Sequence, residues 1–180
     1  MIWADEVLAF WFGLAPERHW TKDEALDAEI TDRFKELWEA EWIASKDGLD
    51  QYLTSADQAL GAIILFDQFP RNMFRGSGHS FATDPLARRI ADAAIERGYD
   101  QELGPERRVF MYLPFEHSEA LSDQDRSVAL FESLGDARYL DFARKHREVI
   151  ARFGRFPHRN AMLGRESTAE EQAFGLEPAW

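Results

Sequence analysis

Apolar residues recur at three- and four-residue steps along nearly the whole chain, and this spacing is typical of amphipathic helices. The first such face consists of Trp3, Val7, Leu8, Trp11 and Phe12. Similar faces follow in the later stretches, and no convincing period-two alternation indicates a strand. We therefore predict an all-α fold of about eight helices, stacked as antiparallel hairpins with short links.

Capping and proline residues divide this pattern into separate helices. Asp84 followed by Pro85 is typical of an N-cap and a first helical position. Asp136 has the residue type of an N-cap before a later long helix. Pro105 opens a shorter helix that we expect to end at Pro114, because proline is disfavoured inside a helix.

Two helix-like segments run into nearly the same short pattern, Phe69-Pro70-Arg71-Asn72 and Phe156-Pro157-His158-Arg159-Asn160. Because proline interrupts a helix and restricts the residue before it, we expect both helices to end there. The cationic residues beyond each proline would then lie on a stiff corner. Irregular stretches are predicted at 71–83 and 155–167, and long loops of this kind often carry function.

Composition predicts one ring-rich core, since 45% of the 180 residues are hydrophobic and 13% are aromatic. We expect a single domain over residues 1–180. The absence of cysteine excludes thiolate catalysis, disulfides and cysteine-ligated metals. The longest apolar run, 59–66, is too short to span a bilayer, and no signal peptide is recognisable. A soluble, cytoplasmic protein is expected.

The charge is strongly acidic but unevenly distributed. A net charge of −12 argues against binding to nucleic acid or to an anionic membrane, because both require a broad basic surface. Residues 144–165 nevertheless hold seven basic residues and one acidic residue, a net +6. This cationic segment suits a small anionic molecule or an acidic segment of a partner protein. We predict no cofactor.

Asp67 stands out because it lies on an apolar helix face, four residues after Ile63 and three after Ile64. A carboxylate there is disfavoured by burial and by the negative end of the helix dipole. We expect an arginine partner, whose planar fork engages both oxygens. The favoured interpretation is a structural ion pair between hairpins. The alternative is that Asp67 orients an arginine that binds a ligand.

The two corners supply candidate ligand-binding residues: Arg71 and Asn72 in the first, and Arg155, Arg159 and Asn160 in the second. Arginine binds carboxylate or phosphate through two parallel bonds, and asparagine adds an orienting donor and acceptor. If the corners converge, they form a pocket for a phosphate- or carboxylate-bearing ligand. Alternatively, these arginines cap helix carbonyls and pair with acidic neighbours.

Three residues are candidates for acid–base catalysis: Glu116, His117 and His158. Histidine titrates near neutrality, and a neighbouring carboxylate tunes it. We predict no metal site, because the chain lacks a His-x-x-x-His or similar ligand spacing. His146 lies among apolar positions of its helix and is predicted to be a core histidine.

Four stretches of this chain resemble an uncharacterised bacterial family, domain of unknown function 924. They are LFDQFPRN at 65–72, FATDP at 81–85, YLPFEHSE at 112–119 and RFGRFPHRN at 152–160. The resemblance covers essentially the whole chain. It implies a helical fold similar to tetratricopeptide arrays, and it implies no established activity.

These observations favour a helical protein with a polar pocket for a small anion, without deciding whether the protein is an enzyme. One alternative is a tetratricopeptide-like adaptor whose concave face binds another protein, which fold analogy alone supports. A further alternative is that the arginine corners are structural locks between hairpins. On that view, removing Arg71 or Arg159 would cost the stability of a buried charge pair.

Overall fold

A computed structural model describes residues 2–175, and helices without any strand make up its regular structure in that range. The α-helices are α1 (Ile2–Phe12), α2 (Glu24–Ala44), α3 (Ala56–Ile63), α4 (Phe69–Met73), α5 (Asp84–Glu96), α6 (Tyr99–Glu102), α7 (Pro105–Glu116), α8 (Leu121–Leu134), α9 (Ala137–Phe153) and α10 (Ala169–Phe174). The 3₁₀-helices are η1 (Pro16–His19), η2 (Ser45–Asp47), η3 (Asp50–Tyr52), η5 (Gly78–Phe81) and η6 (Pro157–Arg159), and the π-helix is η4 (Ile64–Gln68). The predicted all-α class is confirmed, and the tetratricopeptide-like arrangement stays a prediction.

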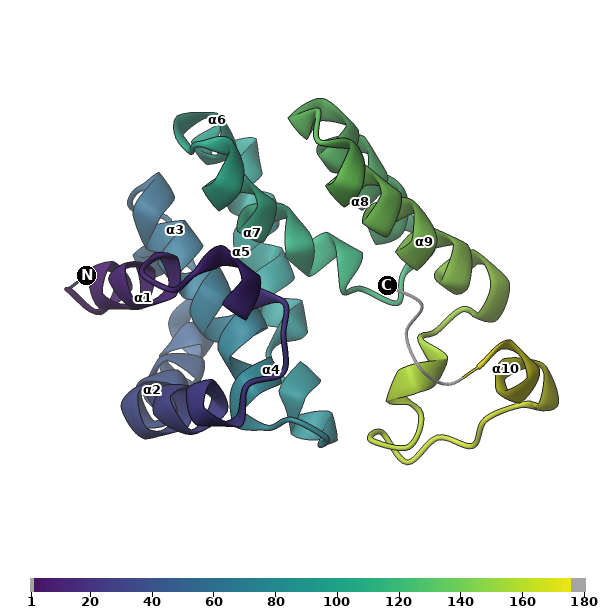
Figure 1. The fold of residues 1–180 in the computed structure, drawn as a ribbon. Helices are drawn as coiled ribbons and strands as arrows, with labels where there is room; N and C mark the ends of the chain where they lie inside the picture. The colour runs from purple at the N-terminus through teal and green to yellow at the C-terminus, as the bar shows by residue number, and fades with distance from the viewer. Residues whose placement is uncertain (1, 176–180) are drawn as a thin grey trace.

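The helices pack against one another in pairs (Figure 1). The pairs include α1 with α3, α2 with α4, α7 with α8, and α8 with α9. In Figure 1, α1 to α4 lie on one side, α8 and α9 lie on the other, and α5 and α7 lie between them. No helix within residues 2–175 has both the length and the apolar character needed to cross a bilayer.

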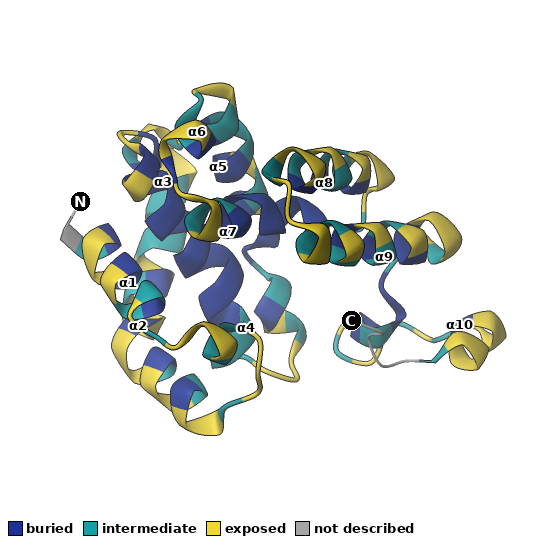
Figure 2. Cartoon of the chain, turned by 45° about the horizontal axis from the view of Figure 1, so that its top comes forward, coloured by how far each residue is buried: buried dark blue, intermediate teal, exposed yellow. Residues whose placement is uncertain are grey.

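The core is rich in aromatic rings, as the composition predicted. Trp11, Phe34, Trp38, Phe66 and Phe69 are each at most 1% exposed and belong to one large cluster. Figure 2 shows the buried residues gathered where the helices meet. A second, small cluster holds the end of α9 against the chain that follows it. Buried aromatic rings therefore contribute to both clusters, and Phe156 is the buried ring of the smaller one.

The prediction that the first helix ends at its Phe-Pro corner is wrong. Helix α3, the π-helix η4 and α4 follow one another without a break, and Pro70 lies within that run. The wider π turn carries a hydrogen bond from the Phe69 N–H to the Ile64 carbonyl. Pro70 has no N–H to donate, and Thr83 Oγ1 instead donates to the Phe66 carbonyl at 2.6 Å. A side chain thus satisfies a carbonyl beside the proline, and the helix continues.

Two further helix boundaries differ from the predicted ones. Helix α7 does not end at Pro114 but continues to Glu116, with His117 as its C-cap. The N-cap of α5 is Thr83, and Asp84 is the first residue of that helix. The Asp84 carboxylate is therefore directed to other partners, described below. The predicted cap of α9 is confirmed, because Asp136 accepts hydrogen bonds from two backbone N–H groups of its first turn.

The second Phe-Pro corner has the predicted form. Helix α9 ends at Phe153, and Gly154 takes the left-handed conformation, φ +68°. Glycine adopts this conformation without the steric cost that a Cβ would bring. Pro157 then starts the short helix η6. This turn directs the chain back toward the first corner.

Gly61 sets how closely α1 approaches α3. A Cβ at this position would lie 2.8 Å from Cβ and 3.0 Å from Cα of Ala4, so the α1 backbone would have to move. We expect Gly61→Ala to lower the free energy of unfolding by about 1–3 kcal/mol, the usual cost of overpacking. Denaturant unfolding measures this. Gly104→Ala, where a Cβ meets nothing within 4 Å, is the control, and equal losses for the two variants would contradict the close-approach explanation.

Candidate functional site

Asp67 is the centre of a buried charge cluster. Its side chain is fully buried in the π-helix, and Arg71 Nη1 stands 3.4 Å from its Oδ1. The same Nη1 also donates to the backbone carbonyl of Asp67. Arg71 is bidentate with Asp84, because Nη1 and Nη2 donate to the two carboxylate oxygens at 2.9 Å each. One guanidinium therefore joins the π-helix to the start of α5.

The other partner of Asp67 is His117, whose Nδ1 lies 2.8 Å from Asp67 Oδ1. Gln68 Nε2 donates to the second oxygen, Oδ2, at 2.6 Å. Burial alone would raise the pKa of Asp67, but Arg71 and His117 outweigh it and hold that pKa at about 2. An ionised carboxylate accepts, so Nδ1 of His117 carries the proton and Nε2 keeps a basic lone pair.

The electrostatic surroundings keep His117 neutral. Burial and the nearby Arg71 cation lower the pKa of His117, and the Asp67 carboxylate opposes them. The net direction is downward, so the ring is uncharged at neutral pH. A neutral imidazole oriented by a carboxylate is the arrangement that a general base requires.

Glu116, the last residue of α7, is a buried carboxyl held in its neutral form. Burial, followed by the charge on Asp67, raises the pKa of Glu116 to about 8. Its Oε1 lies 3.5 Å from Nδ1 of His146. That nitrogen is also 2.8 Å from the Phe142 carbonyl, and burial lowers the pKa of His146 to about 3. The Glu116–His146 contact thus joins two neutral groups at pH 7.

Gln124 on α8 holds the turn that carries Glu116 and His117. This fully buried amide donates from Nε2 to the Glu116 carbonyl at 2.6 Å and to the Ser118 carbonyl at 2.7 Å. Carbonyls at the C-terminus of a helix have no partner within the helix. Gln124 satisfies that of Glu116 and also binds the Ser118 carbonyl in the turn that follows, so the end of α7 and this turn are held against α8.

Arg159 on η6 is a buried cation with poor compensation. Only 7% of the residue is exposed, and its Nη1 stands 3.9 Å from Asp84 Oδ2. Its guanidinium carbon lies 4.4 Å from the ring centre of Phe81 and 4.5 Å from that of Phe156. Within the described residues, its Nε has no hydrogen-bond partner. Burial and the charge on Arg71 lower the pKa of Arg159 to about 10.

A cavity of about 290 Å³ opens where these groups meet, and we call it the cationic cavity. It is lined by Arg71, Arg75, Ser80, Phe81, His117, His146, His158, Arg159 and Met162. Its described walls thus include three arginines and three histidines and no carboxylate. The carboxylates Asp67 and Asp84 pair with Arg71 but are not among the lining residues. Two further cavities also have His117 in their walls.

Comparison with known proteins places the chain in a family. The model of the family described as "Bacterial protein of unknown function (DUF924)" matches residues 7–178. The chain belongs to the DUF924 family. It is also similar to the solved structure of a protein of unknown function from Agrobacterium tumefaciens. The two share 45% identity over 95% of each chain, with a TM-score of 0.88. No protein among curated sequences matches this DUF924 chain.

Not all of the predicted site residues of this DUF924 protein line the cationic cavity. Arg71, His117, His158 and Arg159 do, and Glu116 lies in the wall of an adjoining cavity. Burial and the charge on Arg159 lower the pKa of His158 to about 4, so its ring is neutral at pH 7. The two corners therefore meet, although Arg71 and Arg159 are 88 positions apart in the sequence.

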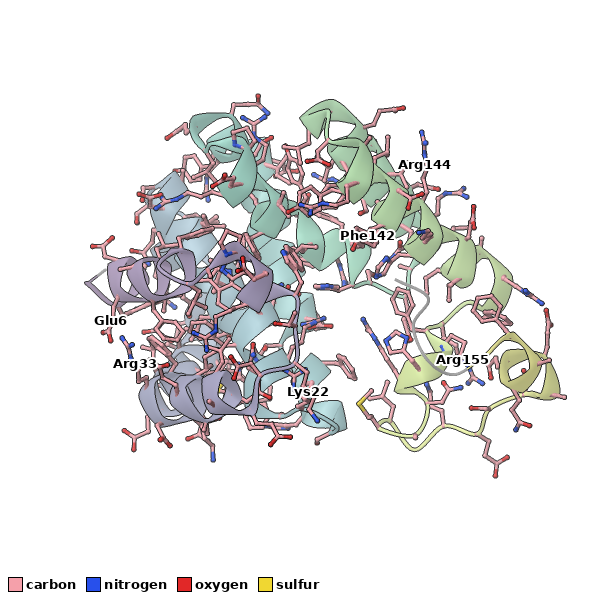
Figure 3. The ribbon with its side chains drawn as sticks, viewed as in Figure 1. Glu6, Lys22, Arg33, Phe142, Arg144 and Arg155 are labelled. Atoms are coloured by element: carbon pink, nitrogen blue, oxygen red, sulfur yellow. The ribbon has the colours of Figure 1, made fainter. Side chains whose placement is uncertain are left out.

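The other three predicted ligand-binding residues are engaged elsewhere in the DUF924 fold. Asn72 donates to Asp27 Oδ1 at 2.8 Å. Arg155 is bidentate with Glu171 at 2.6 and 2.9 Å, and Figure 3 shows it between η6 and α10. Asn160 is 1% exposed, and its amide donates to Glu171 at 3.2 Å. Arg155 and Asn160 thus hold the C-terminal segment in place and do not face the cationic cavity.

Several residues of this DUF924 site were not predicted from the sequence. Asp84 was interpreted as a helix cap, yet its carboxylate binds Arg71. Phe81 belongs to the FATDP stretch that resembles the family but was assigned no role, and Gln124 gave no signal beyond a polar residue in a helix. His146 is buried as predicted, and it also lines the cavity. Within residues 2–175, no three histidine or carboxylate groups are arranged to hold a metal ion.

Proposed function

We propose that the cationic cavity binds a small molecule bearing a carboxylate or a phosphate, and that His117 exchanges a proton with it. The observation that carries this proposal is the composition of the cavity wall. None of the described lining residues is acidic. Of the three lining arginines, Arg71 is bidentate with Asp84 and Arg75 with Asp27, whereas Arg159 has no such partner within hydrogen-bond distance among the described residues. An anion is the ligand that such a wall attracts.

Arg159 is the group that most requires an anion. Removing a cation from water is costly unless a charge and hydrogen bonds replace the water. Arg71 has both of its outer nitrogens bonded to Asp84, whereas Arg159 approaches Asp84 no closer than 3.9 Å. A bound carboxylate or phosphate would supply the missing acceptors, because a guanidinium engages two oxygens in parallel.

The chemistry that these groups support is general acid–base catalysis. His117, neutral and oriented by Asp67, serves as the base through Nε2. Glu116 keeps its proton up to about pH 8 and therefore serves as an acid. Perturbed carboxyl and imidazole groups beside a cavity are typical of active sites. The proposed reaction class is proton transfer on an anionic substrate, or on a water molecule that attacks it.

Arg159→Met tests the ligand role and keeps the side-chain bulk between Phe81 and Phe156. We expect phosphate, or a member of a carboxylate panel, to raise the melting temperature of the wild type at constant ionic strength. The variant is expected to bind that anion about 10- to 100-fold more weakly, the range for a lost charge-assisted hydrogen bond. Without ligand, the variant is expected to be as stable as the wild type or slightly more so, because an undercompensated cation has been removed.

The control is Arg152→Met. Arg152 is half exposed, pairs with Glu170 at 2.9 Å, and lies outside the cationic cavity. The Arg152→Met variant should bind the anion with the same affinity as the wild type. Equal anion affinity in wild type and Arg159→Met would contradict the proposal. A loss of several kcal/mol of stability in Arg159→Met without ligand would instead identify a structural lock between the corners.

A further inference from the structure

A second cavity adjoins the cationic one and differs from it in character. It has a volume of about 380 Å³, and we call it the aromatic groove. It is lined by Trp20, Leu113, Glu116, His117, Arg138, Tyr139, Phe142 and His146. Four of these eight residues, Trp20, Leu113, Tyr139 and Phe142, have uncharged aromatic or aliphatic side chains. This volume is in the range of small-molecule sites.

The walls of the aromatic groove come from three separate segments. Trp20 follows η1, Leu113 belongs to α7, and Tyr139 and Phe142 belong to α9. The rings of Trp20 and Tyr139 are 6.0 Å apart, and Figure 3 shows Phe142 on the side of α9 that faces α7. Trp20 is 49% exposed, although a tryptophan gains much free energy from burial.

The aromatic groove and the cationic cavity meet at His117 and His146, which line both. Glu116 lines the groove on one side of this junction, and Arg71 and Arg159 line the cavity on the other. His117, the proposed base, and Glu116, the proposed acid, therefore lie where the cationic cavity meets the aromatic groove. A ligand that fills only the cationic side would leave the acid, Glu116, out of reach in the neighbouring space.

We infer that the ligand is an amphipathic organic anion, with its carboxylate or phosphate at Arg71 and Arg159 and its apolar part in the aromatic groove. This inference rests on the proposed function and names the substrate class for that site. The bond that reacts would lie near His117, between the anionic group and the apolar part. Small inorganic anions would then bind at the arginines without filling the site.

Unbranched alkanoates from acetate to octanoate test this inference, with binding to the wild type measured by titration calorimetry. Affinity is expected to rise about three- to fourfold for each added methylene that enters the groove, following the transfer free energy of a buried CH₂. Phe142→Ala should flatten this dependence on chain length and leave the affinity for acetate unchanged. 1-Octanol, which lacks the charge, should bind more weakly than octanoate.

Phe174→Ala is the matched control, because Phe174 is an exposed ring on α10 that lines neither cavity. It should show the wild-type dependence on chain length. If acetate and octanoate bind equally well, or if Phe142→Ala keeps the full dependence, the amphipathic ligand is ruled out while anion binding stands. If neither phosphate nor any alkanoate binds, the proposed function itself fails.

Discussion

Replacing Asp67 with alanine is expected to lower the free energy of unfolding by on the order of 3–5 kcal/mol, the cost of removing one partner from a buried charge pair. Asp67 is fully buried, and its loss would leave Arg71 with Asp84 alone and His117 without its acceptor. Denaturant unfolding monitored by tryptophan fluorescence would measure the loss. Ligand binding at His117 should weaken as well, because this ring would lose the carboxylate that orients it.

Two variants make this experiment specific. Asp57→Ala removes an exposed partner of Arg107, a surface pair at 2.9 Å, and is expected to cost less than about 1 kcal/mol. Asp67→Asn keeps an oxygen that accepts from His117 but removes the charge. The pKa of His117 should therefore fall further, which an NMR titration of the ring would detect. Comparable stability losses in Asp67→Ala and Asp57→Ala would contradict the buried cluster as described.

Glu116→Gln is expected to stabilise the protein at alkaline pH, by on the order of 4 kcal/mol at pH 8. Folded Glu116 holds its proton up to about pH 8, whereas an unfolded glutamate releases it near 4.5. Between these values the folded state binds more protons than the unfolded state. The stability of the wild type therefore falls as pH rises through this window and levels off above it. Glutamine does not titrate in this range, so its contribution to the free energy of unfolding does not fall as pH rises.

His146 and His158 give the free energy of unfolding the opposite dependence on pH, at lower pH. Folded His146 and His158 stay neutral down to about pH 3 and pH 4, whereas unfolded histidines are protonated below 6.5. Their contribution to stability is therefore lost as pH falls below 6.5. Together with Glu116, they predict a wild-type maximum near pH 6.5. Unfolding curves between pH 5 and 9 would trace this profile.

Glu119→Gln is the control for Glu116→Gln, and its effect on stability is expected to have the opposite sign. Burial raises the pKa of Glu119, but the bidentate Arg165 outweighs it, and the net pKa is lowered. This carboxylate stabilises the fold when ionised, so its replacement should cost stability at pH 8. If Glu116→Gln also loses stability at pH 8 relative to wild type, then Glu116 is ionised in the folded protein, and its proposed role as an acid is wrong.

The two Phe-Pro corners show why similar local sequences gave predictions of unequal value. Phe156-Pro157 follows Gly154, and the left-handed glycine ends the helix before the proline is reached. Pro70 has no such glycine before it, and the helix passes through it by means of a π turn. The hydroxyl that makes this possible comes from Thr83, on a segment that only the fold brings close.

Arg155 and Arg159 illustrate the same limit at the site. Both belong to one cationic corner and looked equivalent as ligand-binding candidates. The fold places Glu171 against Arg155, where the pair closes a structural link to α10. It places Arg159 between two phenylalanine rings at the wall of the cavity, where its Nε has no partner among the described residues. Spacing along the chain does not distinguish these outcomes.

The amino-acid sequence by itself determined the helical class, the aromatic core, the burial of Asp67 and the choice of residues from which a site could be built. Each of these depends on residue type and on the 3.6-residue period, which are local properties. The tertiary structure alone decided which arginines are paired with a carboxylate, including the pair of Arg71 with Asp84. It also decided that Glu116 and His117 lie between the cationic cavity and the aromatic groove. These outcomes depend on which distant helices pack together, because the charge and burial of a group are set by neighbours far away in the sequence.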